Sequence, residues 1–106
     1  MTARNQWREE IPVVAGTPSA PVYFPARARA LAAKVKPGGG GTARIEFTLD
    51  DPASVVAAPN AADWEVWEPG DVAVSTSRAL LGAVTAVRGV ATTQNAVLQV
   101  IAATDY

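Results

Sequence analysis

Apolar and polar residues alternate along two neighbouring stretches of the chain, one on each side of a run of four glycines. The apolar positions are Leu31, Ala33 and Val35 before the glycines, and Ile45, Phe47 and Leu49 after them. A period of two is typical of a strand with one buried face. Residues 26–36 are also rich in good helix formers, but the alternation favours strand over helix. We predict two strands joined as a hairpin with its tip at residues 37–41, and Lys34 or Lys36 facing Glu46 across the pair.

The glycine run allows two interpretations. Glycine N–H groups can surround a phosphate, but a nucleotide-binding loop also needs a Lys and a Ser or Thr after its last glycine, followed by a helix. In this chain Thr42 follows Gly41 without a Lys, and the next predicted element is a strand. We therefore interpret the run as a turn, which is either a flexible outer loop or a close backbone contact.

Short stretches rich in β-branched residues fill much of the remaining chain, at intervals of about 8–12 residues, which suits a sandwich or barrel. Residues 83–91 and 96–103 are predicted to form a terminal hairpin. Both stretches carry apolar residues on both faces, so each strand is expected to be central in a sandwich or covered by another subunit. The predicted fold class is all-β: a single antiparallel β-sandwich or jelly-roll-like domain of about seven short strands, with an extended N-terminal arm.

The arm comprises residues 1–20, and the sandwich domain comprises residues 21–106. Pro12 and Pro18 disfavour a helix interior or a central strand within the arm. The arm is too apolar for a solvated tail, so it either packs on its own domain or docks on a neighbour. The candidate partner-docking residues are Trp7, Ile11, Val13 and Val14.

Composition excludes several classes of function. The 106 residues have room for one core, and the nine basic and ten acidic residues nearly balance. No run of Lys or Arg marks a nucleic-acid surface. The polar N-terminal stretch lacks the apolar segment of a secretory signal, and no apolar run reaches the ~20 residues that a membrane span needs. We therefore expect a protein made in the cytoplasm that binds neither nucleic acid nor membrane.

Groups suited to catalysis are scarce. Cysteine and histidine are absent, which removes common metal ligands and the commonest general base. Asp50 and Asp51 are interpreted as part of a turn, because neighbours in an extended chain point to opposite faces. A calcium-type site at Glu65, Glu68 and Asp71 is not favoured, because their spacing fits no known loop motif. We predict no enzymatic activity, no catalytic residues, no cofactor and no metal.

Trp64 and Trp67 suggest a carbohydrate-stacking platform, but three residues apart in a strand they lie on opposite sides. The favoured interpretation is that Trp64 fills the core and Trp67 covers a subunit or the edge of a sheet. The candidate oligomer-interface residues are Trp67, Val97 and Ile101.

Several motifs occur in a recognisable order. They are PVYFPARARAL, the glycine turn, ARIEFT, DWEVWEPGDV, ALLGAVTAVR and VIAATDY. Over residues 20–103, this order resembles the small β-sandwich virion proteins of tailed bacteriophages, of the head decoration, cement or head-fibre type.

The resemblance implies a non-enzymatic structural protein that is associated with the capsid and located in the virion, after synthesis in the host cytoplasm. It also implies a symmetric oligomer, a homotrimer, whose partner is the major capsid protein or another virion protein. The N-terminal arm would be the anchor. The alternative is a carbohydrate- or receptor-binding module at a virion tip, with Trp67 on its binding surface.

Overall fold

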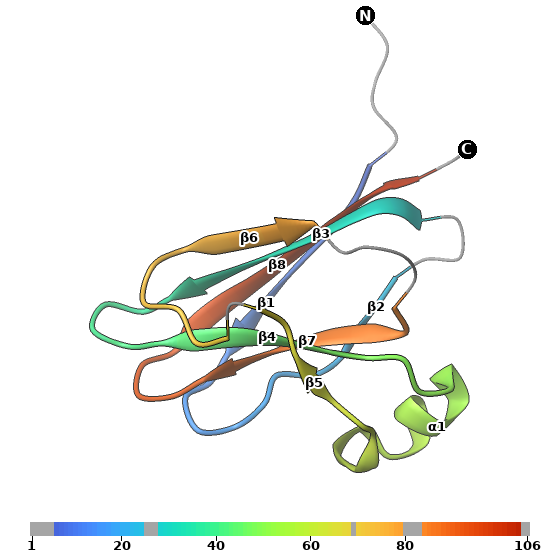
Figure 1. Ribbon diagram of the computed structural model, residues 1–106, viewed down its shortest axis with the longest axis horizontal. Helices are drawn as coiled ribbons and strands as arrows, with labels where there is room; N and C mark the ends of the chain where they lie inside the picture. Colours follow the sequence, from blue (N-terminus) through green and yellow to red (C-terminus); the bar gives the residue numbers. More distant parts are fainter. Residues whose placement is uncertain (1–5, 25–27, 69, 80–83, 105–106) are drawn as a thin grey trace, which may run out of the picture.

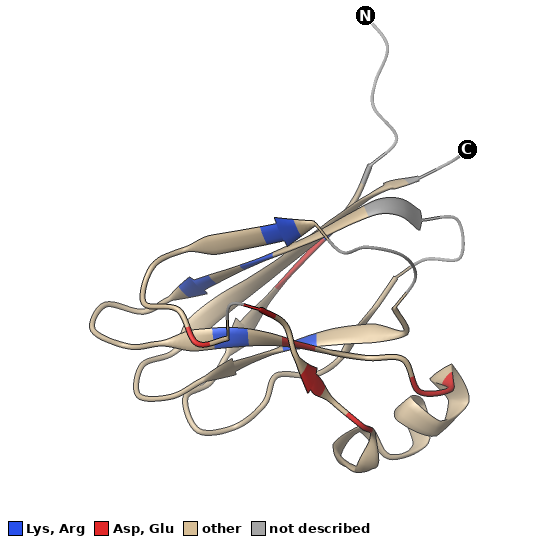
Figure 2. Cartoon of the chain, viewed as in Figure 1, with Lys and Arg blue, Asp and Glu red and all other residues tan. Residues whose placement is uncertain are grey.

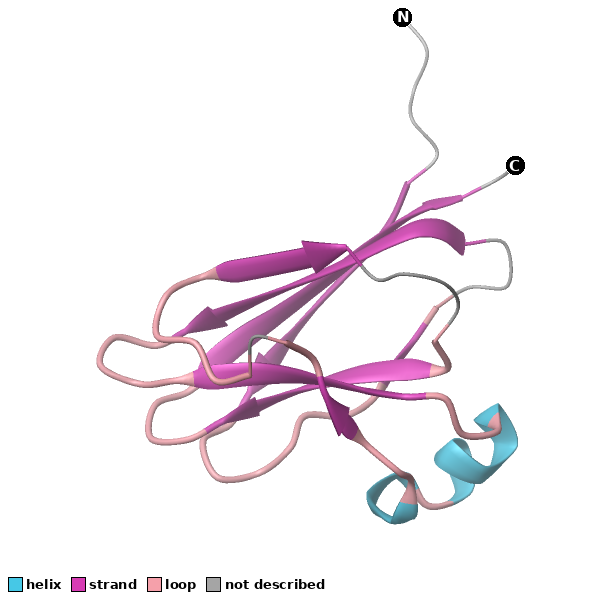
Figure 3. Ribbon diagram, viewed as in Figure 1, coloured by secondary structure: helices cyan, strands magenta, loops and turns pink. Residues whose placement is uncertain are grey.

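The computed structural model describes residues 6–24, 28–68, 70–79 and 84–104 (Figure 1). The strands are β1 (Gln6–Val13), β2 (Val22–Tyr23), β3 (Ala28–Pro37), β4 (Ala43–Thr48), β5 (Glu65–Val66), β6 (Thr76–Ala79), β7 (Ala86–Ala91) and β8 (Ala96–Thr104). The short helices α1 (Pro52–Ala57) and η1 (Pro59–Ala61) lie together between β4 and β5 (Figure 3). Neither helix has the length and apolar character that crossing a membrane requires.

The strands form two antiparallel sheets. Sheet A has the order β1-β8-β3-β6, and sheet B has the order β2-β7-β4-β5. The pairs β1–β8, β2–β7, β3–β6 and β4–β5 are those of one long hairpin folded about its middle. When this ribbon curls, β3 also pairs with β8 and β4 with β7, which completes the sheets. This is a jelly roll, so the predicted all-β fold, an antiparallel sandwich or jelly-roll-like domain, is confirmed, with eight strands in the described residues where about seven were expected.

The two predicted strands around the glycines exist, although Leu49 lies beyond the end of β4 and is 61% exposed. The predicted hairpin between the two strands is wrong. β3 belongs to sheet A and β4 to sheet B, so the glycine turn connects the two sheets. Lys34 lies opposite Gln99 and Ser77, whereas Glu46 lies opposite Arg88 and Val66. Alternation determines which face of a strand is buried, and it carries no information about the neighbouring strand.

The predicted terminal hairpin is wrong for the same reason. β7 lies in sheet B between β2 and β4, and β8 lies in sheet A between β1 and β3. Both strands are therefore central, which is one of the two alternatives that their apolar faces left open. The turn between them, residues 92–95, passes from one sheet to the other, as the glycine turn does.

These two turns lie against each other at one end of the sandwich. A Cβ atom added to Gly38 would lie 2.4 Å from the backbone oxygen of Asn95, and one added to Gly41 would lie 2.7 Å from Cβ of Gln94. Contacts this short leave no room for a side chain at either position. The two ends of the glycine turn therefore make a close backbone contact, whereas Gly39 and Gly40 at its tip are exposed.

The core fills the space between the two sheets and consists mainly of small aliphatic side chains. Its buried members are Val13, Val22, Leu31, Ala33, Val35, Ala43, Ile45, Val87, Ala91, Ala96, Leu98, Val100 and Ala102. Most of the sheet A contribution comes from alternate positions of β3 and β8. The opposite positions on these strands point away from the core and form the outer face of sheet A.

The described part of the N-terminal segment packs on its own domain. β1 pairs with β8 along its whole length, from Gln6 opposite Ala103 to Val13 opposite Ala96. Val13 is fully buried, and the ring of Trp7 meets the edge of Phe24 at 5.5 Å between centroids. Residues 6–13 are therefore an edge strand of the sandwich rather than an arm separate from it.

The segment after β4 contains two short helices, α1 and η1. The carboxylate of Asp51 accepts a hydrogen bond from the Ser54 N–H at 3.3 Å and caps α1, with a proline in its first turn. Asp50 accepts a hydrogen bond at 2.8 Å from the Asp63 N–H, which ties the far end of the segment back to its start. The segment 49–64 is thereby folded onto itself beside sheet B (Figure 1).

Candidate interaction surfaces

The outer face of sheet A is partly apolar and partly charged. Its side chains form rows across the sheet, because directly opposed residues in antiparallel strands share a face. The rows are Arg8, Ile101, Ala32 and Ala79; then Glu10, Gln99, Lys34 and Ser77; then Pro12, Val97 and Lys36. The central side chains of these rows are only half-buried. β3 and β8 contact their sheet neighbours and, through the core, sheet B.

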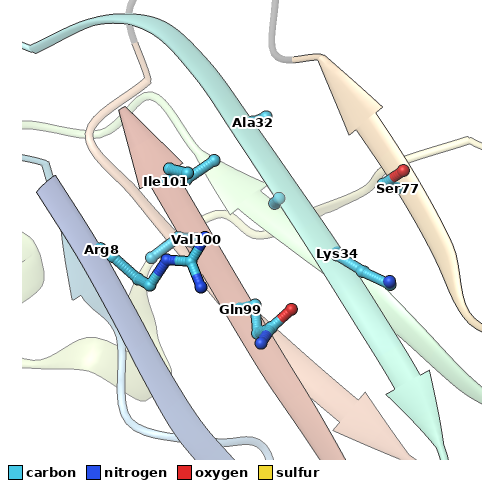
Figure 4. A pocket seen from close by; sticks show the side chains of 8 residues that line it. Arg8, Ala32, Lys34, Ser77, Gln99, Val100 and Ile101 are labelled. Carbon is cyan, nitrogen blue, oxygen red and sulfur yellow. The ribbon is translucent and has the colours of Figure 1, made fainter. Parts of the chain in front are cut away.

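A hollow of about 170 Å³ lies on this outer face (Figure 4). Its floor is apolar, formed by Ala32 and Ile101, and its polar groups come from Arg8, Lys34, Ser77 and Gln99. Arg8 extends from β1 over β8, while Lys34 and Ser77 lie on the other side of the hollow (Figure 4). Gln99 Nε2 also donates a hydrogen bond to the Glu10 carboxylate.

The chemistry of the hollow suits a carboxylate. A guanidinium and an ammonium group supply positive charge, and a hydroxyl and an amide supply further hydrogen-bond donors. The apolar floor offers contact to the aliphatic part of an acidic side chain.

The outer face of sheet B is different, because it contains a buried carboxylate. The Glu46 side chain is only 7% exposed. Arg44 Nε contacts Glu46 Oε2 at 2.8 Å, and Arg88 contacts Glu46 Oε1 at 2.8 Å. Arg44 also reaches the carboxylate of Asp71 at 3.4 Å. Each oxygen of the buried carboxylate therefore has a cationic donor.

Trp64 covers this cluster. The guanidinium carbon of Arg88 lies 4.4 Å from the centre of the Trp64 ring, which is a cation–π contact. The indole Nε1–H donates to the Pro59 carbonyl at 2.7 Å. The expectation that Trp64 fills the core is therefore wrong: it lies half-buried over the outer face of sheet B, held by the 49–64 segment.

Arg44 shows the electrostatic consequence of this arrangement. Burial lowers the pKa of its guanidinium, but the hydrogen bonds and charges of Glu46, and then of Asp71, outweigh burial and raise that pKa above its ordinary value. The cation is therefore fixed in place by its acidic neighbours. Sequence analysis missed the cluster, although Arg44 and Glu46 on one face of a predicted strand were a visible signal.

Trp67 lies on the other side of sheet B and packs against the core. Its ring meets Phe47 edge to face, with 5.0 Å between centroids and 80° between planes. The prediction that Trp64 and Trp67 form no common platform is confirmed. A second hollow, open and of about 310 Å³, lies beside Trp67, Phe47, Val66 and Glu68.

The structure does not bring the candidate interface residues to one surface. Val97 and Ile101 share the outer face of sheet A, whereas Trp67 lies at the edge strand of sheet B. Of the candidate docking residues, Val13 is buried, Trp7 and Ile11 are half-buried against the core, and Val14 is 59% exposed.

The acidic residues near β5 do not form a metal site. Within residues 6–24, 28–68, 70–79 and 84–104, no three acidic side chains lie close enough together to hold a metal ion. Asp71 is turned toward Arg44, whereas Glu65 and Glu68 are exposed.

Comparisons with known proteins identify no relative. No protein-family model, no curated protein sequence and no solved structure matches the chain.

Proposed function

We propose that this protein is a non-enzymatic structural component of a tailed-phage virion, associated with the capsid and assembled as a symmetric oligomer. Its role is mechanical: apolar area buried between copies, and against neighbouring virion proteins, adds to the cohesion of the particle. The motif order that resembles small virion proteins is the sequence basis of this proposal.

The observation that carries the proposal is the uncovered outer face of sheet A in a jelly-roll fold. Jelly rolls are frequent in viral capsid proteins and lectins, although a fold alone does not assign a function. Ile101, Val97 and Ala32 place apolar side chains at the centre of this face. A central sheet face that is apolar and only half-buried suits contact with another protein chain.

The N-terminal attachment also belongs to the proposal, in a modified form. β1 is an edge strand, so its outer backbone groups are available for pairing with a strand of another protein. Arg8, Glu9 and Glu10 are exposed along this strand. We propose that attachment uses the edge of β1 and the exposed Val14, while Val13 remains in the core.

Detection of the protein in particles tests this function. Gradient-purified virions produced from the source genome should contain the chain in a fixed copy number per major capsid protein, measured by quantitative mass spectrometry. Absence of the chain from intact particles would refute the proposal. Empty heads and tails analysed separately would show which part of the virion holds it.

A receptor-binding module is the second candidate, and the hollow beside Trp67 favours it. Carbohydrate sites combine an aromatic ring, which contacts the apolar face of a sugar, with polar groups that bind its hydroxyls. Trp67 and Glu68 supply both next to an open hollow. This fold class also includes lectins.

Glycan-array binding of the purified protein separates the two candidates. The structural proposal expects no specific glycan, and no change when Trp67 is replaced by alanine. Specific binding that is lost in Trp67→Ala and retained in Trp64→Ala would favour the receptor-binding function. Trp64 is a suitable control because it lies on the opposite side of sheet B.

A further inference from the structure

Charge is distributed unevenly between the two sheets (Figure 2). On the outer face of sheet A, Arg8, Lys34 and Lys36 outnumber the single carboxylate of Glu10. On sheet B, the cations Arg44 and Arg88 are engaged by acidic partners. The sheet A face is therefore basic, and sheet B contributes little free positive charge.

The opposite charge collects at the edge of sheet B. We call Asp63, Glu65 and Glu68, together with Val66, the acidic edge; all four residues are exposed, and Val66 is 51% exposed. The ion pairs found among the described residues involve none of these three carboxylates. Asp50 lies next to Asp63 through a hydrogen bond and adds to the negative potential there.

These two surfaces match in chemistry as well as in charge. The hollow on sheet A has an apolar floor with cationic and hydrogen-bonding groups around it. At the acidic edge, Val66 and Glu68 line one open hollow, whereas the side chain of Glu65 points to the other face of β5 from Val66. An apolar contact surrounded by opposite charges is the usual anatomy of a specific protein interface.

The positions of the two surfaces determine the kind of assembly. They are built from different residues: the hollow is lined by β1, β8, β3 and β6, whereas the acidic edge lies at and beside β5. A two-fold dimer uses the same patch on both copies, whereas a head-to-tail contact joins two different patches and generates a ring or a filament. Val97 and Ile101 on one surface, and Trp67 beside the other, fit the head-to-tail arrangement.

We propose that the outer face of sheet A of one copy binds the acidic edge of a second copy, so that the chain assembles head to tail. A carboxylate of the acidic edge, Asp63 or Glu65, occupies the hollow between Arg8 and Lys34. The aliphatic part of the same acidic side chain contacts the apolar floor formed by Ala32 and Ile101. This inference rests on the oligomeric part of the proposed function and specifies its interface.

Charge reversal on each surface tests the arrangement. The variant R8E/K34E has an acidic face and an acidic edge, and the variant D63K/E65K has a basic face and a basic edge. Each variant alone should self-associate with a dissociation constant at least about tenfold higher than that of the wild type, because like charges then face each other. Sedimentation velocity at low salt measures this constant. Mixed in equal amounts, the two variants should associate again, since each basic surface meets an acidic one.

Recovery on mixing is the decisive result. An isologous interface built on sheet A alone would leave D63K/E65K self-association unchanged, and this outcome would overturn the proposal. Association of both variants as strongly as the wild type would also overturn it, as would a wild type that stays monomeric. Far-ultraviolet circular dichroism and thermal unfolding of each variant verify that the fold is intact.

Two controls distinguish a specific contact at the hollow from a general attraction between charged surfaces. Glu9→Lys reverses an exposed charge that lies on the other side of β1 from the hollow and should leave association unchanged. Addition of glutarate tests whether the hollow takes any dicarboxylate; it should compete with association only at millimolar concentrations. If the mixing experiment succeeds and the chain is absent from virions, the interface stands and the proposed function fails.

Discussion

The charged side chains on the outer faces of the two sheets have different surroundings. On sheet B, Glu46 is buried between Arg44 and Arg88, and Trp64 and the 49–64 segment cover part of this cluster. On sheet A, Arg8 and Lys34 surround a hollow that no partner within the described chain fills. The same residue types therefore serve intramolecular structure on one face and remain available for contact on the other.

The degree of burial determines how much the charged side chains of each face contribute to the free energy of unfolding. A charge pair removed from water loses much of its solvation, so the loss of one partner leaves the other charge uncompensated. An exposed charge keeps its solvation and contributes little to stability. Substitutions on sheet B should therefore change the free energy of unfolding, whereas substitutions on sheet A should change association.

The largest effect is expected for Glu46→Ala. The two guanidinium groups would lose their shared carboxylate, and the side chain of Arg88 is only 13% exposed. We expect a loss of about 3 kcal/mol in the free energy of unfolding, measured by urea denaturation of the monomer. Glu46→Gln keeps a hydrogen-bond acceptor, so its free energy of unfolding should fall by less than that of Glu46→Ala. A loss below about 1 kcal/mol in Glu46→Ala would show that water solvates the cluster.

Removal of the cover over the cluster should have a smaller effect. In Trp64→Ala the cation–π contact with Arg88 and the hydrogen bond to Pro59 both disappear. We expect a loss of about 2 kcal/mol in the same denaturation experiment. Trp64→Phe retains an aromatic ring, so its free energy of unfolding should fall by roughly half as much as that of Trp64→Ala. Equal losses in the two variants would argue that the indole N–H bond, and not the ring, holds the segment.

Substitutions in the centre of the sheet A face should separate stability from assembly. Val97→Ser with Ile101→Ser removes apolar area that the described chain leaves half-buried. We expect the free energy of unfolding to fall by about 1.5 kcal/mol, because each of these side chains is partly buried in the monomer. Association measured by light scattering should be lost. A large loss of stability with unchanged association would mean that these side chains belong to the core.

The smallest effect on stability is expected for Lys34→Gln. Lys34 lies opposite uncharged residues on both neighbouring strands, Gln99 and Ser77. Its removal should change the free energy of unfolding by no more than about 0.5 kcal/mol. The salt dependence of association should weaken, since one of the two cations at the hollow is gone. Unchanged salt dependence would place the electrostatic contact elsewhere.

The candidate surfaces were predicted only in part. Val97 and Ile101 were recognised because they add a second apolar face to β8, a feature visible in local sequence. The Glu46 cluster was not recognised, because Arg88 lies 42 positions away in the sequence and meets Glu46 only through the pairing of β4 with β7. Charged residues at alternate positions of an isolated strand are otherwise typical of a solvated face.

Local patterning determined where these strands lie and which face of β3 is buried, as Leu31, Ala33 and Val35 illustrate, because side chains alternate along any extended backbone. It was wrong at the end of β4, where Glu46 and Thr48 are buried and Leu49 is exposed. Only the tertiary structure decided the neighbours. The backbone groups that pair strands are the same in every residue except proline, so they do not encode a partner. The curled ribbon brings β1 to β8 and separates β3 from β4, and the 49–64 segment places Trp64 over Arg88 on the outer face of sheet B.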